Sequence, residues 1–412
     1  MNAGDIGFIL ICSTLVFFMT PGLALFYGGL VRRKNVINTM ISSIAIIGLA
    51  IVLWILFGFS LSFGGDHFGI IGDFRWFGLN KLGLDIGPYS STLPTLVFAV
   101  FQMMFAIITP ALITGATAGR MKFNALFLFI ILWSFIVYYP MAHMVWGIGG
   151  FLNEIGSVDF AGGNVVHISS GVSALILCII LGKRTDYHHV SYRIHNVPMV
   201  ALGATILLFG WFGFNSGSAL AANGLAAHAF MTTAGSAGAA MLVWMLIEVI
   251  YNKKPTLIGA VTGLVAGLVA ITPGAGFVPI WASLIIGAVV SPICYIMISF
   301  IKKRFGYDDA LDAFGCHGIG GIWGGIATGL FTDSSINSVA RWNGLAFGDT
   351  KLFIAQVISI IVTILVATVG TLICIGIVKL FMPLRVSKKA ESIGLDLSEH
   401  GETAYPSFNG FD

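Results

Sequence analysis

Charged residues are scarce in this 412-residue chain: Asp, Glu, Lys and Arg together make up 9% of it, whereas hydrophobic residues make up 57%. A soluble domain carries roughly 25% charged residues, so this composition excludes an ordinary soluble protein. The net charge of +3 is too small and too scattered to indicate nucleic-acid binding. Many apolar runs exceed the roughly 18 to 20 residues that span a bilayer, which predicts a polytopic membrane protein.

Cysteine is scarce too, and its spacing carries no motif. The five cysteines are dispersed through apolar segments without paired spacing, so neither a disulfide framework nor a zinc site is indicated. The chain has no Arg-rich span and no ring of membrane carboxylates, which disfavours a voltage-gated or pH-gated ion channel. We therefore expect no metal and no cofactor.

The apolar runs predict an all-α fold with eleven transmembrane helices. Sixteen Lys and Arg residues fall in loops on one side of the membrane and four in loops on the other. The positive-inside rule assigns the side with sixteen to the cytosol and the side with four to the outside. This asymmetry and an odd number of spans put the N-terminus outside and the C-terminus in the cytosol. The fifth, eighth and tenth spans are short and rich in glycine, so hydropathy alone would miss them first. The predicted spans are residues 6–31, 36–63, 92–118, 124–152, 164–181, 197–218, 226–250, 256–271, 277–301, 315–331 and 352–381.

Two histidines lie within apolar segments, each with an aspartate upstream and glycines nearby. His167 follows Asp159 in DFAGGNVVHISSG, and His317 follows Asp312 in DAFGCHGIGG. An ionisable side chain at membrane depth is costly to keep, so it indicates function, and we expect the two histidines to be partners. For Asp159, capping of the fifth span is an alternative role. Neither histidine has a second ligand at the spacing of HExxH, which disfavours a membrane-embedded metal hydrolase.

The two histidine stretches predict an internal repeat. A unit of five spans must insert upside down relative to its copy, and such inverted repeats place the substrate path at their interface near the bilayer midplane. We therefore expect a transmembrane domain over residues 1–382, with inverted halves at about 1–195 and 196–335 and an eleventh helix at about 352–381. The polar tail, residues 383–412, is either a docking segment or a disordered terminus.

Two neutral imidazoles suit a small polar solute. Burial favours the uncharged form of histidine, so the pair offers hydrogen-bonding nitrogens rather than fixed charge. Carrying an ammonium-like cation through a core of low dielectric costs on the order of 20 kcal/mol in the idealised case. Deprotonating an amine with a Lys-like pKa of about 10.4 at pH 7 costs only roughly 5 kcal/mol. Deprotonation is therefore the easier route, and a potassium ion has no such option.

Aromatic residues at helical spacing predict a vestibule for a cation. Phe101 and Phe105 share a face of the third span, and Trp211, Phe214 and Ser218 share a face of the sixth. Ring faces with one hydroxyl suit a cation, and a dry constriction would follow. For any single Phe, packing in the core or against lipid is the alternative.

Six motifs, in this order, resemble the Amt/Mep ammonium transporter family, a branch of the Amt/Mep/Rh superfamily. They are FQMMFA, PMAHMVWG, DFAGGNVVHISSG, GWFGFNSGS, DAFGCHGIGG and GLDLSEHGETAY, and the similarity covers essentially the whole chain. The resemblance implies a multi-pass protein of the cell membrane, not an enzyme, and a homotrimer in which each subunit has its own pore. Met103 and Met104 stand where many relatives have smaller residues.

The resemblance also implies an outer site. Trp146, Phe105 and Ser218 would recognise ammonium, or methylammonium, and Asp159 would be the acid that supports this site. Phe101 would line the vestibule. Ammonium would lose its proton beyond this site.

Further in, the resemblance implies a narrow hydrophobic pore. Phe105 and Phe214 would form a stacked gate, Trp211 would line the route, and His167 and His317 would be the twin histidines of the pore. The resemblance implies that ammonia moves into the cytoplasm, with or without a separately relayed proton. The tail resembles a segment that helps to dock a PII-type signalling protein. A sensor that binds ammonium but transports it slowly is the alternative within the family.

Overall fold

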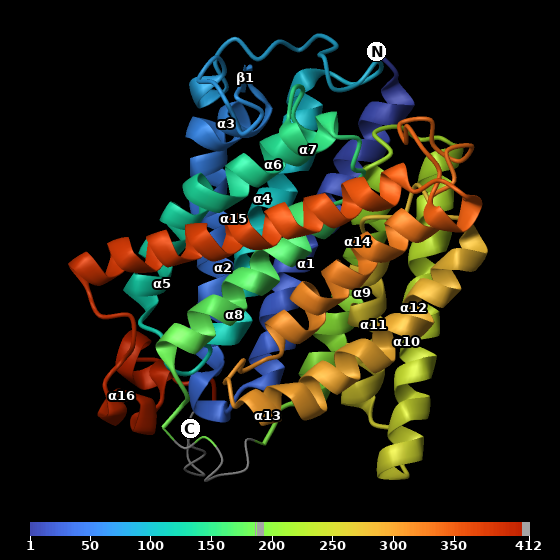
Figure 1. Ribbon diagram of the computed structural model, residues 1–412. Helices are drawn as coiled ribbons and strands as arrows, with labels where there is room; N and C mark the ends of the chain where they lie inside the picture. The colour runs from blue at the N-terminus through green and yellow to red at the C-terminus, as the bar shows by residue number, and fades with distance from the viewer. Residues whose placement is uncertain (186, 188–192, 406–412) are drawn as a thin grey trace.

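The computed structural model describes residues 1–185, 187 and 193–405. The chain forms a bundle of helices, most of which run along its long axis (Figure 1). Within this described part, nine helices are long and apolar enough to cross a membrane. The chain is therefore a multi-pass membrane protein, as its composition predicts.

The first five predicted spans coincide with helical segments, three of which continue through a π-helical turn. Their elements are α1 (Ala3–Leu30), α2 (Val36–Leu53) with η2 (Trp54–Gly58) and α3 (Phe59–Phe63), α4 (Thr95–Thr117), α5 (Phe123–Trp133) with η4 (Ser134–Tyr138) and α6 (Tyr139–Trp146), and η5 (Gly163–Ile168) with α8 (Ser169–Leu181).

The remaining predicted spans coincide with helical segments as well. Their elements are α9 (Val197–Gly217), α10 (Gly224–Asn252), α11 (Leu257–Ile271), α12 (Ile280–Ile296) with η6 (Met297–Ile301) and α13 (Lys302–Phe305), η7 (Phe314–Gly318) with α14 (Ile319–Phe331), and α15 (Lys351–Phe381). Short elements complete the described chain: η1 (Arg33–Asn35), β1 (Asp66–His67), β2 (Ile71–Gly72), η3 (Phe77–Leu79), α7 (Phe151–Glu154), η8 (Leu345–Phe347), α16 (Lys388–Ile393) and η9 (Asp396–His400).

Two of these segments are not among the nine. α11 has only 15 residues, and the segment η7–α14 is rich in glycine, which lowers its hydropathy. They correspond to the eighth and tenth predicted spans, two of the three that we expected hydropathy to miss. The fifth predicted span, which we also expected hydropathy to miss, is the segment η5–α8, and it is among the nine.

The predicted fourth span, 124–152, is too long at its outer end. α6 ends at Trp146, where the backbone of Gly147 turns to an extended conformation, and α7 begins separately at Phe151. A Cβ atom at Gly147 would lie only 2.6 Å from Nδ1 of His143, so the close approach of this helix end to the histidine requires glycine.

Glycine allows the two histidine-bearing segments to meet. A Cβ atom on Gly171 of α8 would lie 2.1 Å from the amide nitrogen of Gly318 in η7. A Cβ atom on Gly321 of α14 would lie 3.1 Å from the Cβ atom of His167. Small residues therefore let these backbones approach closely, as in other membrane helix pairs, and the contact places the two histidines opposite each other.

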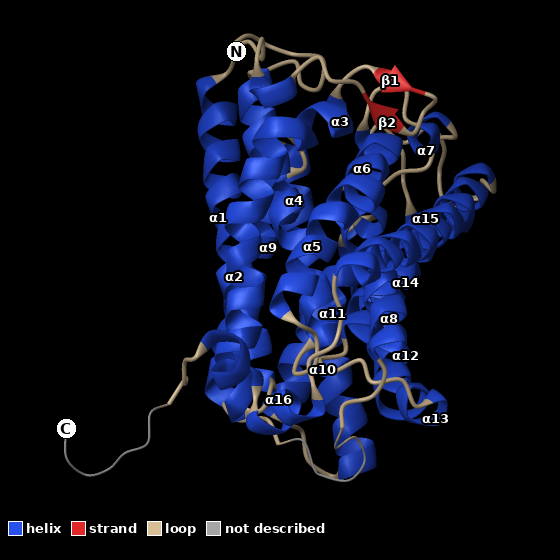
Figure 2. Cartoon of the chain, turned by 90° about the vertical axis from the view of Figure 1, so that its left-hand side faces the viewer, coloured by secondary structure: helices blue, strands red, loops and turns tan. Residues whose placement is uncertain are grey.

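α15 lies obliquely across the outside of the bundle and packs against α14, α8 and α5 (Figure 1). The tail that follows it folds back onto the end of the bundle opposite the N-terminus (Figure 2). There the carboxylate of Asp396 accepts the backbone N–H of Asn38 at 2.9 Å, and that of Glu391 accepts the backbone N–H of Thr185 at 2.6 Å. The described part of the tail is thus docked, and residues 406–412 lie outside the described residues.

Candidate functional site

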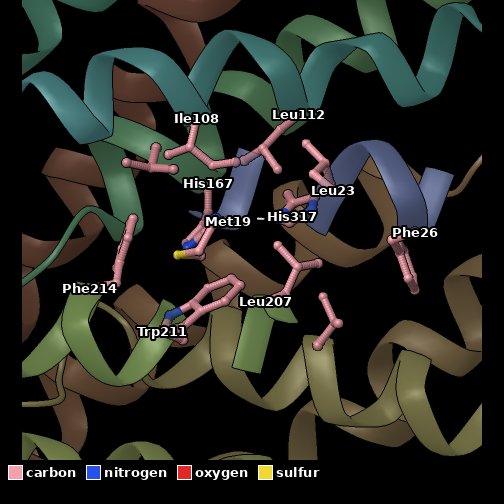
Figure 3. Close-up of a pocket in the computed structure, with 12 residues that line it drawn as sticks. Met19, Leu23, Phe26, Ile108, Leu112, His167, Leu207, Trp211, Phe214 and His317 are labelled. Carbon is pink, nitrogen blue, oxygen red and sulfur yellow. Dashed lines mark hydrogen bonds between the residues drawn. The ribbon is translucent and has the colours of Figure 1, made fainter. Parts of the chain in front are cut away.

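His167 and His317 face each other in the middle of the bundle (Figure 3). Their Nδ1 atoms are 3.3 Å apart, and the two rings are nearly parallel, with centroids 5.3 Å apart. Both side chains are buried. The expected partnership is therefore present, although the two residues are 150 positions apart.

Each histidine lies on a π-helical turn whose first amides are capped by an aspartate. The carboxylate of Asp159 accepts N–H groups from Gly162, Gly163 and Asn164 at 2.6 to 2.8 Å. This is the capping role that we considered for Asp159. π-Helical turns are rare and often occur at functional sites because they re-aim side chains.

Asp309 caps the second turn. It accepts the backbone N–H groups of Ala313 and Phe314 at 3.1 and 2.8 Å. Asp312, the aspartate that begins the DAFGCHGIGG stretch, instead forms an ion pair with Lys302. The eight-residue separation of Asp159 from His167 is matched by Asp309 and His317.

Trp211 fixes the ring of His167. The two rings stack with centroids 5.3 Å apart and an interplanar angle of 19°, and the indole N–H of Trp211 donates to Thr272 Oγ1 at 2.9 Å. The pocket around the histidines is lined almost entirely by apolar side chains, among them Met19, Leu23, Ile108, Leu112 and Leu207. Its volume is about 10 Å³, close to the space that one water-sized molecule needs.

Phe105 and Phe214 close the outer end of this pocket. Their ring centroids are 4.3 Å apart, and Phe214 also stacks on His167 at 6.2 Å. Phe101 packs edge-on against Phe105 at 5.1 Å, behind the ring pair. The two rings that the family resemblance pairs are therefore in contact.

A second cavity, of about 180 Å³, lies on the outer side of Phe105. Trp146 packs edge-on against Phe105 at 5.7 Å, and its indole N–H donates to the backbone oxygen of Asp159 at 2.9 Å. Ser218 donates its hydroxyl to the backbone oxygen of Phe214, which leaves its oxygen lone pairs available to the cavity. The cavity is lined by Tyr89, Phe98, Gln102, Phe105, Trp146, Phe160, Ser218 and Leu220.

Sequence reasoning missed Gln102. Its side-chain oxygen is buried without a hydrogen-bond partner in the described structure, and it lines the outer cavity three residues before Phe105. The signal was available, since Gln102 shares a face of the third span with Phe98 and Phe105. Asp159, in contrast, reaches the site through its carbonyl contact with Trp146, while its carboxylate caps η5.

A third cavity, of about 200 Å³, lies on the side of the tail. Phe26 lines both this cavity and the histidine pocket, and Cys316, next to His317, also lines it. Arg32, Arg184, Arg193 and Asp312 give it a polar wall. An outer cavity, a narrow histidine pocket and an inner cavity therefore follow one another through the bundle.

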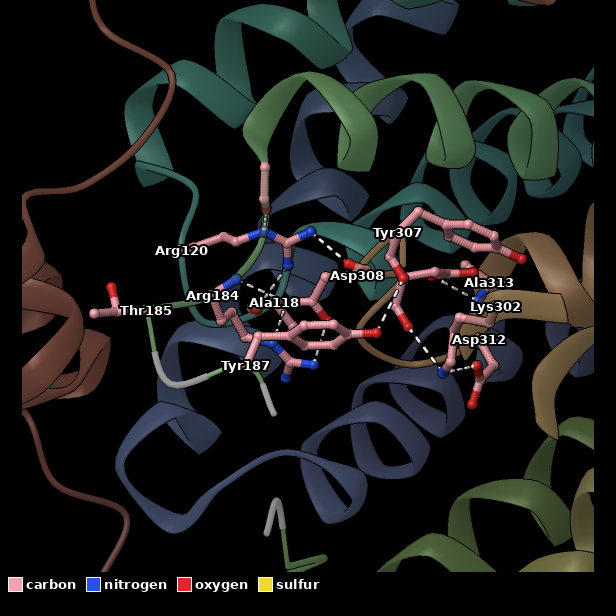
Figure 4. A network of polar contacts seen from close by, with 12 residues as sticks. Ala118, Arg120, Arg184, Thr185, Tyr187, Lys302, Tyr307, Asp308, Asp312 and Ala313 are labelled. Carbon is pink, nitrogen blue, oxygen red and sulfur yellow. Dashed lines mark hydrogen bonds and ion pairs between the residues drawn. The ribbon is translucent and has the colours of Figure 1, made fainter. Parts of the chain in front are cut away.

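A buried polar network supports the inner end of this route (Figure 4). Arg120, which is fully buried, donates to the backbone oxygens of Gly182 and Asp308 at 2.9 and 2.5 Å. Arg184 forms a bidentate pair with the Asp308 carboxylate at 2.6 and 2.8 Å. Burial alone would raise the pKa of Asp308, but the hydrogen bonds from Arg184 lower it. The network holds the loop that carries Asp309, the cap of η7.

Among the described residues, no group of three or more His, Cys, Asp or Glu is placed to hold a metal ion. The chemistry of the site is therefore that of two imidazoles, aromatic rings and a few neutral oxygens. Such a set can bind a small cation by ring faces outside and pass a neutral solute by hydrogen bonds inside.

A sequence model of the Ammonium Transporter Family matches residues 7–405. The chain belongs to the ammonium transporter family. The resemblance carried by the six motifs is thus confirmed, and with it a place in the cell membrane.

Individual relatives agree with this membership. The chain is 51% identical over 405 residues to an ammonium transporter of Bacillus subtilis (strain 168), covering 98% of this chain and 99% of the relative. Its fold is similar to the crystal structure of Saccharomyces cerevisiae Mep2, with a TM-score of 0.87, 35% identity, and coverage of 94% and 91%. It is also similar to a structure described as a sensor Amt protein, with a TM-score of 0.87, 29% identity, and coverage of 96% and 98%. Relatives of this ammonium transporter family are named as transporters, which indicates transport rather than catalysis.

Proposed function

We propose that this ammonium transporter recruits ammonium at the outer cavity, removes a proton there, and conducts ammonia past His167 and His317 into the cytoplasm. The observation that carries the proposal is the contact of 3.3 Å between the two Nδ1 atoms. It lies in a narrow apolar pocket between two larger cavities.

The histidine contact determines what the pore offers to a solute. In a neutral pair one ring donates its only N–H proton from Nδ1 and so presents an Nε2 lone pair, whereas the accepting ring carries its only proton on Nε2. The buried Nε2 of His167 has no partner in the described structure. The pair therefore supplies one donor and one acceptor, which ammonia can satisfy and a potassium ion cannot. Exchange of the two tautomers gives a route for a separately relayed proton.

The outer cavity supplies the recruitment site. The rings of Trp146 and Phe105 attract a cation through their faces, and Ser218 adds an oxygen acceptor, with Phe101 packed behind. Ammonium must release its proton to external water at the outer cavity before the contact of Phe105 with Phe214, because the space beyond is dry and narrow. Asp159 supports this site by holding the indole of Trp146 through its backbone oxygen.

We also propose eleven transmembrane helices in two inverted halves, about 1–195 and 196–335, with α15 as the eleventh. The capped π-helical turns before His167 and His317 support the repeat. The N-terminus would be outside and the tail cytosolic, since they lie at opposite ends of the bundle (Figure 2) and the basic loops share the side of the tail. Labelling of single cysteines placed in the loops from either side of the membrane tests this topology.

Two assembly proposals follow from the family. The first is a homotrimer with one pore per subunit, which native mass spectrometry of the purified protein tests; a monomeric mass would contradict it. The second is that a PII-type signalling protein docks at the cytosolic face, beside the tail. Co-purification of such a protein with the intact chain, but not with a chain ending at residue 382, tests it.

Uptake of labelled methylammonium into cells that lack their own transporter tests the transport proposal. His167→Ala should abolish most of the uptake, whereas His228→Ala, which removes a histidine bonded only to the backbone oxygen of Val278 in the described structure, should leave it near the wild-type rate. Unchanged uptake in His167→Ala would remove the histidine pair from the mechanism. Current recordings over a pH series report whether charge accompanies each solute.

A slow-transporting sensor is the second candidate, favoured by the similarity of fold to the sensor Amt protein. It predicts binding of methylammonium by the purified protein with uptake near background. Saturable binding and saturable uptake at the same concentrations would exclude it.

A further inference from the structure

His143 of α6 makes two hydrogen-bond contacts that require an extra proton. It is fully buried, and its Nδ1 lies 3.0 Å from the backbone oxygen of Ser62. Its Nε2 lies 2.9 Å from the carboxylate Oδ1 of Asp66. The Asp66 side chain is 34% exposed, so a proton on this pair can exchange with water.

The proton count follows from the chemistry of the two partners. A backbone oxygen and an ionised carboxylate are both acceptors, whereas a neutral imidazole has one N–H donor and one lone pair. Both contacts can exist together only if the pair holds one more proton than a neutral His143 beside an ionised Asp66. That proton lies either on the imidazole or on the carboxyl group. When it leaves, one nitrogen lone pair must face an acceptor, and one of the two contacts is lost.

The pair joins the outer loop to the helix that ends at Trp146. Asp66 lies in β1, and Oδ1 of its carboxylate also accepts the backbone N–H of Gly69 at 2.8 Å. The backbone oxygen of Gly69 in turn accepts the N–H of Phe151 in α7 at 2.8 Å. His143 lies three residues before Trp146, about one helical turn away. The contact between His143 and Asp66 therefore holds both the loop that contains Asp66 and the end of α6 that carries Trp146.

The other titratable groups on the segments packed against α6 have partners elsewhere or lie away from the pair. Those segments are α3, β2, α7, η4 and η5. Beside β2, Asp73 pairs with Arg75 at 2.8 Å. On α7, Glu154 pairs with Arg341 at 3.8 Å. The remaining such groups are His67 of β1, which is exposed, Tyr138 of η4, Tyr139 of α6 itself, and His167 of η5 in the histidine pocket.

We propose that His143 and Asp66 form a positioning pair whose shared proton makes the outer ammonium site depend on external pH. At acidic external pH the pair is complete, and it holds the loop and Trp146 in place. As the external pH rises, the pair loses its proton, one contact breaks, and the site becomes less well formed. The link to ammonium rests on the proposed function, whereas the link between the pair and the loop does not.

Hydrogen–deuterium exchange of the purified protein tests the pair without any need for transport. After correction for the intrinsic pH dependence of exchange, amides of residues 64–72 in the wild type should be protected at mildly acidic pH and lose protection at mildly alkaline pH. Asp66→Ala should remove this step. An alanine side chain accepts neither from His143 nor from the backbone N–H of Gly69, so the loop should be loosened at every pH. Asp85→Ala, in the same outer loop, is the matched control and should behave as the wild type.

Methylammonium uptake over the same pH range then tests the consequence for the site. The amine stays protonated there, since amines of this kind have a pKa of about 10. The half-saturating concentration of the wild type should rise by about fivefold from the acidic to the alkaline end, the effect of losing one hydrogen bond, with little change in maximal rate. Asp66→Ala should show the high value throughout.

The outcomes separate the two proposals. A wild-type loop with no corrected pH step, or an Asp66→Ala loop that keeps the step, would overturn the positioning pair. The wild-type measurement decides this even if the variant does not fold. A pH step in exchange with no methylammonium uptake at any pH would instead overturn the proposed function and leave the pair standing.

Discussion

Asp159 and Asp309 occupy matching positions: each stands eight residues before one of the paired histidines and accepts the first amides of the π-helical turn that carries it. A helix start exposes backbone N–H groups that have no partner within the helix. In a membrane such groups must be satisfied within the protein. The two carboxylates do this at opposite ends of the route, which lets both turns begin inside the bundle and meet at His167 and His317.

The stability of the protein should depend on the ionisation of Asp309. Burial and the neighbouring Asp312 raise the pKa of this carboxyl to about 6. A raised carboxyl pKa means that the folded state keeps a proton which the unfolded chain has already lost. This contribution to stability is present below about pH 4 and is lost as the pH rises through about 6.

Asp309→Asn should therefore remove a pH dependence of stability. Relative to the variant, the wild type should lose on the order of 2 kcal/mol between about pH 4 and pH 7, seen as a fall in melting temperature in detergent. Loss of the capping hydrogen bond lowers the stability of the variant equally at every pH, so it does not affect this slope. Asp85→Asn should keep the wild-type slope, and equal slopes for wild type and Asp309→Asn would contradict the assignment.

Ser218→Ala tests the outer cavity. The variant loses an oxygen that accepts from the bound cation, so the half-saturating concentration of methylammonium should rise by about fivefold, as expected for one hydrogen bond. The maximal rate should change little, because Ser218 lies before the narrow pocket. Thr205→Ala is the matched control: its hydroxyl makes the same contact, with the backbone oxygen four residues earlier in α9, but it faces outward. A similar rise in both variants would indicate a general effect on α9.

Glu391→Ala should release the tail from the bundle. Glu391 accepts from the backbone of Thr185 at 2.6 Å and from Arg385 at 2.7 Å, and it is buried. Loss of these charged hydrogen bonds should raise the rate of trypsin cleavage at Lys388 and Lys389 by about tenfold.

The exposed Glu402 gives the control for the tail. Glu402→Ala should leave the cleavage rate at the wild-type value, because its exposed side chain makes no hydrogen bond or ion pair with the other described residues, and its backbone N–H still donates to the backbone oxygen of Asp396. Unchanged cleavage in Glu391→Ala would show that the tail is held by its other contacts alone.

Much of the fold follows from the sequence. Scarce charge and long apolar runs predict the membrane bundle, and the histidine stretches predict which distant residues meet. Two segments show the limit of hydropathy: α11 has only 15 residues, and glycine lowers the hydropathy of the segment η7–α14. The sequence could not show the π-helical turns, since these arise from tertiary packing and have no pattern of their own.

The candidate site shows a similar division. Phe105, Phe214 and Ser218 could be named because rings and a hydroxyl at helical spacing have a chemical meaning, and Trp146 through the family resemblance. The contact of the Trp146 indole with a backbone oxygen could not, because every residue carries the same carbonyl. The pairing of His143 with Asp66 was equally hidden, since 77 residues separate them and neither lies in a spacing that predicts a partner.

A double-mutant cycle on His167 and His317 tests the central claim most directly, with the initial rate of methylammonium uptake as the measurement. If the two imidazoles act as one unit that shares a proton, His167→Ala and His317→Ala should each lower the rate strongly, and the double variant should be no slower than the slower single variant. Losses that multiply in the double variant would show two independent residues and would contradict the account.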